Sequence, residues 1–331
     1  MNAMTKRERV LKAFNNQTVD RVPVGFWFHF LGEEELSQAL THPELRLLEQ
    51  NIHSHQKYIE DFDPDFVKIM SDGYFLYPRV SEIEPQTAAD LYRFKPIGAD
   101  HPWIQDQVKI VKSVAQKLDG ACCFYNIFAP ANILRINIGY EPFFRIWNED
   151  KAAVAFAAGV IAEDLALLAK LVVEEGGADG IYLSVQNPEN RISAADYFEF
   201  IAPSDKAVLA AANALTPYNI LHCCGYGDNK NDLSIWKDYD AKAVNWATAI
   251  EGVSLVEGKQ LFGGKAVIGG FDNRAGKLLH KGTKAEIEKE VEQILSTAGK
   301  IGVILGADCT VPPDLGRERF DFVRNKAIAL G

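Results

Sequence analysis

Three side chains in the C-terminal third of the chain have the types and spacing of a metal site. His222 and Cys224 are separated by one residue, and Cys309 lies far downstream. An imidazole and two thiolates are ligands that a soft divalent metal prefers, above all zinc. Three protein ligands leave a fourth coordination position open, which is where catalytic zinc binds its substrate. The pattern therefore predicts a zinc site that activates a substrate.

A thiol is the substrate that suits such a site best. A free thiol has a pKa of about 8.5 and is mostly protonated at neutral pH, whereas coordination to zinc removes the proton. Two thiolate ligands also make the metal less acidic and leave a bound sulfur rich in electrons. The ligand set therefore favours alkylation of a zinc thiolate over activation of water. Taken singly, each of the three residues would fit an ordinary buried position better than a ligand position.

Eight short apolar runs alternate with helical segments, and these elements must position the triplet. Apolar runs of this kind are typical of parallel strands that are buried on both faces. Eight β/α units in 331 residues predict an α/β fold, a (β/α)8 TIM barrel in a single domain over residues 1–331. An open doubly wound sheet is the alternative. The runs cover residues 22–28, 65–70, 121–127, 180–185, 218–222, 243–246, 266–269 and 302–305.

Capping residues mark the ends of the predicted helices. Capping-box patterns occur at residues 5–8 and 283–286, and the first predicts an N-terminal helix over about residues 5–17. The segment 150–175 is rich in Ala and Leu and ends at two glycines, a common C-terminal signal. A final helix is expected to begin near Leu315.

Barrel geometry would bring the triplet to one rim, because barrel active sites form where the C-terminal ends of the strands meet. His222 closes the fifth run. Cys224 is expected to point the same way, because residues two apart in an extended chain share a face. Cys223, between them, is expected to face away. Cys309 follows the eighth run by a few residues and would open on the same rim.

Several other residues end predicted strands and are candidates for the rim of the pocket. Glu251 and Asp272 are conceivable fourth metal ligands, although a substrate sulfur suits the open position better. Arg135 and Arg145 follow the third run and could anchor an anionic acceptor, but surface helix charge is the simpler expectation for both. The candidate substrate-binding residues are Trp27, His29, Asn126, Gln186 and Asn245.

The composition excludes several classes of partner. The formal net charge is −10 and no basic tract is present, which argues against nucleic acid or an anionic membrane. The N-terminal residues lack the apolar core of a signal peptide, and no apolar stretch reaches the roughly 18 residues that span a bilayer. The five cysteines form a poor disulfide framework, with Cys122 and Cys123 assigned to the core of the third strand. We therefore expect a cytoplasmic enzyme with reduced thiols.

Nucleotide-binding loops are also missing from the sequence. No Gly-x-Gly-x-x-Gly follows the first predicted strand, and no Gly-Lys-Ser/Thr loop is present, so dinucleotide and P-loop sites have little support. Met4 reads equally well as a natural start, so residues 1–3 are expected to be an artificial extension.

The segment 221–225, Leu-His-Cys-Cys-Gly, together with Cys309 resembles the zinc motif of corrinoid-dependent methyltransferases in the uroporphyrinogen decarboxylase superfamily. The resemblance implies a (β/α)8 barrel with zinc held by His222, Cys224 and Cys309. It further implies methyl transfer from a methylated corrinoid (methylcobalamin) to a thiol such as coenzyme M, with the corrinoid on a separate partner protein. The resemblance covers nearly the whole chain and includes residues 4–10, 19–24, 177–180 and 306–314.

The same superfamily includes uroporphyrinogen III decarboxylase, whose reaction is the alternative function. Members of that branch carry an Arg-Gln-Ala-Gly-Arg segment after the first strand, which binds substrate carboxylates. Residues 28–35 read Phe-His-Phe-Leu-Gly-Glu-Glu-Glu instead, so a polycarboxylate would be repelled there. Asp72 is the candidate catalytic residue for this alternative, although an ordinary loop turn explains it equally well. A third reading is a non-catalytic barrel that binds a corrinoid protein or a small ligand, and the oligomeric state is left open.

Overall fold

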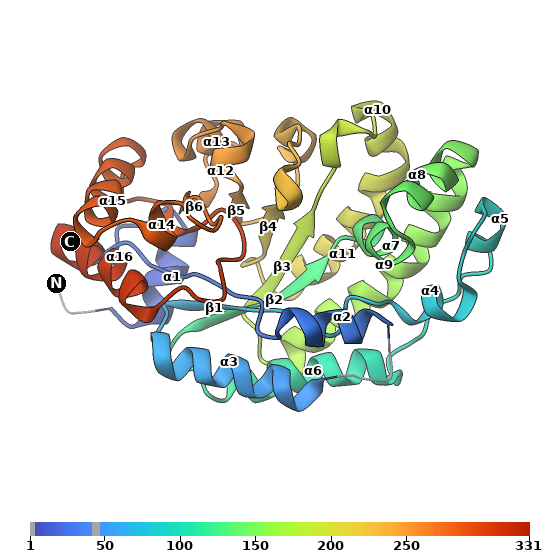
Figure 1. The fold of residues 1–331 in the computed structure, drawn as a ribbon, viewed down its shortest axis with the longest axis horizontal. Helices are drawn as coiled ribbons and strands as arrows, with labels where there is room; N and C mark the ends of the chain where they lie inside the picture. Colours follow the sequence, from blue (N-terminus) through green and yellow to red (C-terminus); the bar gives the residue numbers. More distant parts are fainter. Residues whose placement is uncertain (1–3, 42–46) are drawn as a thin grey trace.

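Within residues 4–41 and 47–331, which the computed structural model describes, seven parallel strands form one sheet (Figure 1). Each strand pairs with the next one along the chain. Each predicted run from the second to the eighth overlaps one of these strands, so this part of the prediction is confirmed. The strands are β1 (Phe66–Ile69), β2 (Cys122–Phe128), β3 (Gly180–Val185), β4 (Ile220–Cys223), β5 (Ala243–Trp246), β6 (Ala266–Phe271) and β7 (Val303–Ala307).

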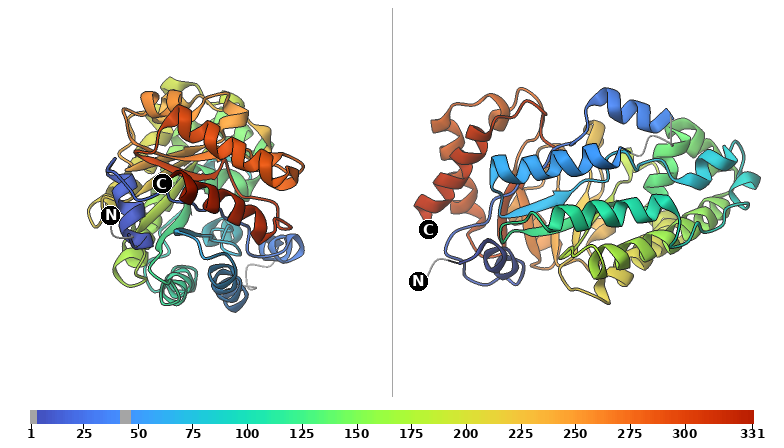
Figure 2. Two further views of the ribbon diagram at one scale, coloured as in Figure 1. Left: turned by 90° about the vertical axis from the view of Figure 1, so that its left-hand side faces the viewer. Right: turned by 90° about the horizontal axis from the view of Figure 1, so that it is seen from below.

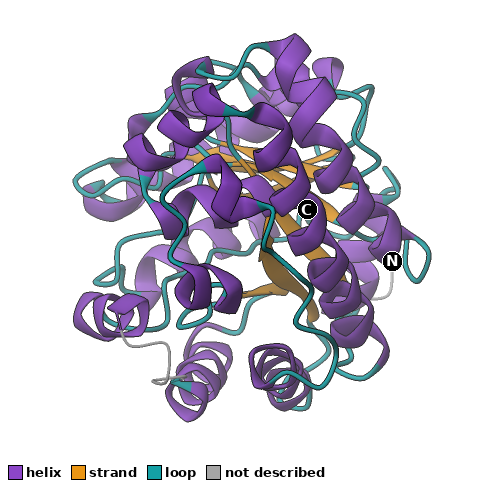
Figure 3. Ribbon diagram, turned by 90° about the vertical axis from the view of Figure 1, so that its right-hand side faces the viewer, coloured by secondary structure: helices purple, strands orange, loops and turns teal. Residues whose placement is uncertain are grey.

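Helices surround the curled sheet on its outer side (Figures 2 and 3). The last helix, α16, packs against both α15 and the early helix α3, so the two ends of the helical layer are neighbours. The longer helices are α1 (Lys6–Phe14), α2 (Glu33–Thr41), α3 (Leu48–Phe62), α6 (Pro102–Ala115), α7 (Pro130–Ile138), α8 (Tyr140–Glu149), α9 (Lys151–Glu174), α11 (Ala202–Asn213), α15 (Lys284–Ala298) and α16 (Arg317–Leu330). The shorter ones are α4 (Pro78–Ile83), α5 (Ala88–Leu91), α10 (Ala194–Asp196), α12 (Thr248–Glu251), α13 (Leu255–Leu261) and α14 (Leu278–Lys281).

The prediction of a first strand over residues 22–28 is wrong. In this segment the described structure has a single isolated parallel bridge, from Val24 to Leu305 of β7. The amide of Gly25 donates to Leu305 O at 3.0 Å, and the amide of Asp65 donates to Val24 O at 3.1 Å. The amide of Val24 bonds instead to the Asp65 carboxylate at 2.8 Å, and Pro23 has no N–H to donate. The segment therefore bonds to β7 on one side and to the residue before β1 on the other without forming a ladder.

The predicted capping boxes are confirmed at both helices. The Thr5 hydroxyl and the Glu8 carboxylate each bond to the other's backbone at the start of α1, and Thr283 and Glu286 do the same at α15. The N-terminal helix is shorter than predicted and ends at Phe14, because the chain turns into the left-handed region near φ 52° two residues later.

Helix α9 corrects one expectation about apolar segments. By length and composition it could cross a membrane, contrary to the prediction that no segment of the chain qualifies. In the fold, 61% of its apolar 18-residue window is buried inside the protein, and the helix packs against α6, α7 and α11. It is the single such helix among the described residues, and its burial is that of a core helix.

Strand side chains alternate between the two faces of the sheet and build two apolar clusters. The outer cluster packs the sheet against the helices and includes Cys123 and Cys223, so Cys223 faces away from the concave side of the sheet as predicted. The inner cluster lies on the concave side and includes Trp27, Phe66, Cys122, Phe124, Tyr182, Ile220, Ala243, Ala266, Ile268 and Ile304.

A buried ion network fastens the N-terminal segments to the base of the sheet. Arg9 and Arg21 donate to the Asp65 carboxylate at 2.9 Å and 2.6 Å. Arg9 also pairs with Asp20 at 2.7 Å. The same carboxylate accepts the Val24 amide, so one side chain joins α1, the bridging segment and the start of β1.

Candidate metal centre

The three predicted metal ligands converge at the C-terminal end of the sheet. His222 lies on β4, Cys224 follows that strand directly, and Cys309 lies shortly after β7. One ligand atom from each residue lies within 4.8 Å of the other two. Ligand atoms around tetrahedral zinc are about 3.4–3.8 Å apart, given bond lengths of about 2.0–2.3 Å. The donor set and its spacing therefore fit zinc after a small closing movement.

Asn245 of β5 fixes the orientation of His222. Its Oδ1 lies 2.5 Å from His222 Nδ1, while its Nδ2 donates to the carbonyls of Ile268 and Ala307 at 2.9 Å and 3.2 Å. The amide oxygen must therefore face the ring, and Nδ1 carries the proton. The other ring nitrogen, Nε2, lies 3.6 Å from Cys309 Sγ with its lone pair available for a metal. Asn245 thus orients His222, and its predicted contact with a substrate stays a prediction.

The pKa values of the Cys309 and Cys224 thiols are shifted in opposite directions. A hydrogen bond from Cys224 lowers the pKa of the Cys309 thiol well below its usual value, with a smaller contribution from His222. The same bond raises the pKa of Cys224, and burial adds to that effect. Burial lowers the pKa of His222, which favours the neutral imidazole that a metal requires. One thiol is therefore easily ionised, while the other retains its proton until a cation displaces it.

A residue that the sequence did not single out, Asn231, holds the loop that carries Cys224. Its Nδ2 donates to Cys224 O at 3.1 Å, and its Oδ1 accepts the amide of Asn187 at 2.8 Å. The amide of Cys224 donates to Val185 O at 2.9 Å. Glu251 accepts both the amide and the Nδ2 of Asn231, at 2.9 Å and 2.7 Å. Asn231 lies in a polar loop, where no local pattern distinguishes it from its neighbours.

No carboxylate joins the three ligands in the part of the chain that the structure describes. Glu251 is occupied by Asn231, and Asp272 pairs with Arg274 at 2.7 Å. Neither of these conceivable fourth ligands therefore belongs to the cluster, and the fourth position stays open.

Lys68 of β1 is a second residue that the sequence did not single out. It is buried, and its Nζ lies 4.2 Å from the ring centre of Tyr182 and 5.1 Å from that of Trp27. Burial lowers the pKa of Lys68 to about 8, against the favourable charges of Cys309 and Cys224. A lone lysine in an apolar strand gives no signal in the sequence, because only the curled sheet brings it near the metal ligands.

Asp72 and His29 form a hydrogen-bonded pair beside the site. His29 Nδ1 lies 2.9 Å from Asp72 Oδ1, and the amide of Phe30 donates to Asp72 Oδ2 at 2.6 Å. Burial lowers the pKa of His29, but the bond to the carboxylate outweighs it, so the pKa is raised overall. Asp72 is completely buried, whereas the His29 side chain is 36% exposed and can meet a ligand.

Two further predicted residues are buried at the curled sheet. Trp27 is fully buried, with its ring centre 6.5 Å from that of His222, and its Nε1 has no hydrogen-bond partner within the described parts of the chain. Asn126 donates to Ser71 Oγ and accepts from Ser184 Oγ, both at 3.1 Å. Asn126 is therefore held by its own neighbours, while Trp27 has a free donor.

Gln186 and Arg135 interact on the exposed side of the site. Arg135 Nη2 donates to Gln186 Oε1 at 2.6 Å, and Gln186 Nε2 donates to Tyr226 O at 3.1 Å. Burial lowers the pKa of Arg135, and the nearby thiol of Cys224 opposes that change. Arg145, by contrast, is an exposed residue of α8, as the simpler expectation had it.

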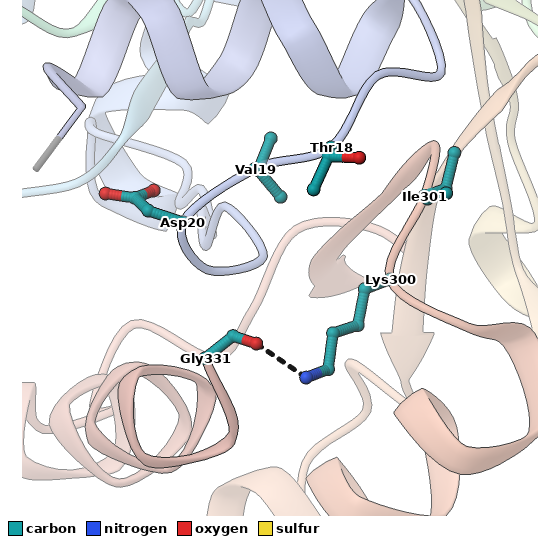
Figure 4. A pocket seen from close by; sticks show the side chains of 6 residues that line it. All are labelled: Thr18, Val19, Asp20, Lys300, Ile301 and Gly331. Atoms are coloured by element: carbon teal, nitrogen blue, oxygen red, sulfur yellow. Dashed lines mark hydrogen bonds between the residues drawn. The ribbon is translucent and has the colours of Figure 1, made fainter. Parts of the chain in front are cut away.

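A cavity of about 460 Å³ lies near the start of β7, away from the strand ends that carry the candidate ligands; Figure 4 shows its lining residues. Lys300 lies just before β7 and therefore at the N-terminal end of the strands, where it donates to Gly331 O at 2.6 Å. The cavity contains none of the predicted site residues and is lined by Thr18, Val19, Asp20, Lys300, Ile301 and Gly331.

Comparisons with known proteins agree with this architecture. The sequence profile described as "Uroporphyrinogen decarboxylase (URO-D)" matches residues 76–326 of the chain. No curated protein sequence matches the chain. Among solved structures, a methyltransferase from Methanosarcina mazei has a TM-score of 0.72 at 16% identity and covers 99% of both chains.

Two further solved structures are more distant. A putative vitamin-B12-independent methionine synthase from Listeria monocytogenes has a TM-score of 0.54 at 13% identity, with 94% of this chain and 96% of that chain covered. A B12-independent methionine synthase from Shewanella sp. has a TM-score of 0.52 at 12% identity, with 93% of each chain covered. At these identities the likeness establishes a shared fold alone.

Proposed function

Because the chain belongs to the uroporphyrinogen decarboxylase family, we propose that it is a zinc-dependent methyltransferase of that family whose methyl acceptor is a thiol. The observation that carries the proposal is the convergence of His222, Cys224 and Cys309 within 4.8 Å, with no carboxylate in the group as far as the structure is described. The fold shared with the Methanosarcina mazei methyltransferase is consistent with it.

The residues of the chain would divide the work as follows. Cys224 and Cys309 supply the two sulfur ligands, and His222 supplies Nε2 because Asn245 holds the proton on Nδ1. Zinc bound there would supply the positive charge that favours the thiolate form of an acceptor thiol. We expect the exposed edge of His29, held by Asp72, and the Trp27 Nε1 donor to interact with a bound acceptor.

The methyl donor belongs to the proposal rather than to the observations. A methylated corrinoid carried by a partner protein is the donor that we expect.

We further infer a single, closed (β/α)8 barrel, since the segment 23–25 bonds both to β7 and to the residue before β1. These inferences require a donor protein that can approach the end of the barrel where Cys309 lies.

Decarboxylation of a tetrapyrrole carboxylate is the second candidate, because the family name and the buried Asp72 favour it. The first turn of α2 carries Glu33, Glu34 and Glu35 at the place where that reaction needs cationic groups. A polycarboxylate would be repelled there, so we rank this candidate below methyl transfer.

Methyl transfer can be tested directly with methylcobalamin as donor and 2-mercaptoethanol as a probe thiol. The zinc-loaded protein should produce the methyl thioether, detected by mass spectrometry, and the Cys309→Ala variant should not. The Cys223→Ala variant is the matched control, because Cys223 faces the outer helices. Formation of coproporphyrinogen from uroporphyrinogen without metal, and no thioether, would contradict the proposal in favour of decarboxylation.

A further inference from the structure

Lys68 is a buried cation without an anionic partner of its own. Its side chain is buried, and among the described residues no carboxylate forms an ion pair with its Nζ. The nearest carboxylate that influences it, Asp72, is already bonded to His29 and to the amide of Phe30. An unpaired buried ammonium is costly, and proteins seldom keep one without a reason.

The aromatic neighbours of Lys68 connect it to the candidate metal ligands. Tyr182 and Trp27 each contact the Lys68 ammonium, with ring centres 4.2 Å and 5.1 Å from Nζ. The same two rings contact His222, with ring centres 5.7 Å and 6.5 Å from that of the imidazole. Lys68 and His222 thus share two aromatic neighbours, Tyr182 and Trp27.

The donors around Lys68 are also unpartnered. Among the described residues, Trp27 Nε1 and Tyr182 OH are buried and have no hydrogen-bond partner. Lys68 and its two aromatic neighbours therefore offer a positive charge and two unused hydrogen-bond donors. Such surroundings favour a negative charge nearby.

A metal site that binds a thiolate substrate would carry the negative charge that Lys68 lacks as a partner. Two thiolates balance a divalent ion and the imidazole is neutral, so three protein ligands give a site with no net charge. A fourth ligand that binds as a thiolate adds one negative charge. The Cys309 and Cys224 thiols are the groups with which Lys68 interacts most favourably.

We propose that Lys68 is the fixed counter-charge for an anionic fourth ligand at the His222–Cys224–Cys309 site, and so selects the thiolate over neutral ligands. This inference rests on the proposed function. On binding, a neutral thiol would lose its proton to solvent, and Lys68 would stabilise the remaining sulfur anion. Lys68 is a positioning and charge-balancing residue in this account and forms no bond to the ligand.

The experiment uses Co²⁺ as the metal probe and compares an anionic with a neutral fourth ligand. Binding of 2-mercaptoethanol and of imidazole is measured from the Co²⁺ absorption spectrum for wild type, Lys68→Met, Lys68→Arg and Lys206→Met. Lys206 is the matched control, since it is an exposed lysine over the ring of Tyr239 and gives the same change in net charge. Loss of the Lys68 charge should weaken binding of the thiolate about 10- to 100-fold, because opposite charges attract strongly in a buried site.

The expected result is selective. Lys68→Met should bind one Co²⁺ and imidazole as wild type does but bind 2-mercaptoethanol more weakly, while Lys68→Arg and Lys206→Met stay close to wild type. Equal weakening for imidazole, or unchanged thiol affinity in Lys68→Met, would overturn the inference while leaving the proposed function intact. Wild type that binds no Co²⁺, or binds it without any response to the thiol, would overturn both.

Protein stability distinguishes a charge effect from a packing defect. Replacing an unpaired buried charge by an apolar side chain of similar length is often neutral or stabilising. Lys68→Met should therefore unfold at or above the wild-type temperature. A lower unfolding temperature together with weaker binding of both ligands would mean that Lys68 supports packing, and the inference would fail.

Discussion

Asn245 Oδ1 lies 2.5 Å from His222 Nδ1, and the two backbone bonds of the Asn245 amide leave it no alternative orientation. This relationship decides which ring nitrogen carries a proton. Because Nδ1 is the donor, Nε2 is directed at the sulfur of Cys309 as a free lone pair. The metal site is thus prepared by a residue that contributes no ligand of its own.

Removal of this orienting residue should weaken metal binding without destroying the site. We expect Asn245→Ala to lower zinc affinity about 10- to 100-fold, as loss of a partner of a metal-bound histidine generally does. Competition with a chromophoric chelator measures the affinity. Asn126→Ala is the control, because Asn126 bonds to Ser71 and Ser184 rather than to a ligand. Equal zinc affinity in wild type and Asn245→Ala would show that the His222 ring needs no such support.

Asp65 should be the most sensitive carboxylate for stability. Asp65→Ala would leave Arg9 and Arg21 without their partner and free the Val24 amide, so we expect a loss of about 3–5 kcal/mol in the free energy of unfolding. Asp63→Ala should change it by less than about 1 kcal/mol, because its ion pairs with Lys6 and Arg324 lie at the surface. Urea denaturation of the two variants tests this, and losses of similar size would contradict it.

The buried carboxyl of Asp205 should make stability depend on pH. Burial raises its pKa to about 7, although the hydroxyls of Tyr197 and Tyr239 donate to it at 2.8 Å and 2.9 Å. The unfolded-state pKa is about 3.9, so between these values the folded state binds more protons and stability falls as pH rises. Above the folded pKa the loss is complete.

Asp205→Asn cannot ionise and should lack this loss. The unfolding temperature of Asp205→Asn minus that of wild type is the quantity to compare. We expect this difference to be at least about 2 °C larger at pH 8.5 than at pH 5. The comparison cancels the contribution of Asp308, whose pKa burial also raises to about 7. A difference that stays constant over this pH range would show that Asp205 is not the group that titrates.

Most of the sheet could be predicted from the sequence because buried strands appear as short apolar runs between helical segments. Residues 180–185 and 243–246 are strands with the predicted bounds. The first run, residues 22–28, forms no strand because the Val24 amide donates to the Asp65 carboxylate and Pro23 has no N–H. Such competition between a distant side chain and a ladder is invisible in a local pattern.

The convergence of His222, Cys224 and Cys309 could be predicted because residue type and alternation carry the signal, and Cys223 does face the outer cluster. The supporting residues could not. Lys68 stands alone among apolar neighbours, and Asn231 among polar ones, so only the three-dimensional arrangement shows what each touches. For Asn245 the position was predicted but its orienting bond to His222 was not.

The zinc content of the purified protein tests the central claim most directly. After incubation with zinc and gel filtration, mass spectrometry of the metal should find about one zinc ion per wild-type chain. Cys224→Ala and Cys309→Ala should retain little, whereas Cys223→Ala should retain the wild-type amount, because its thiol lies in the outer cluster. Wild type without zinc, or Cys309→Ala with a full complement, would contradict the account.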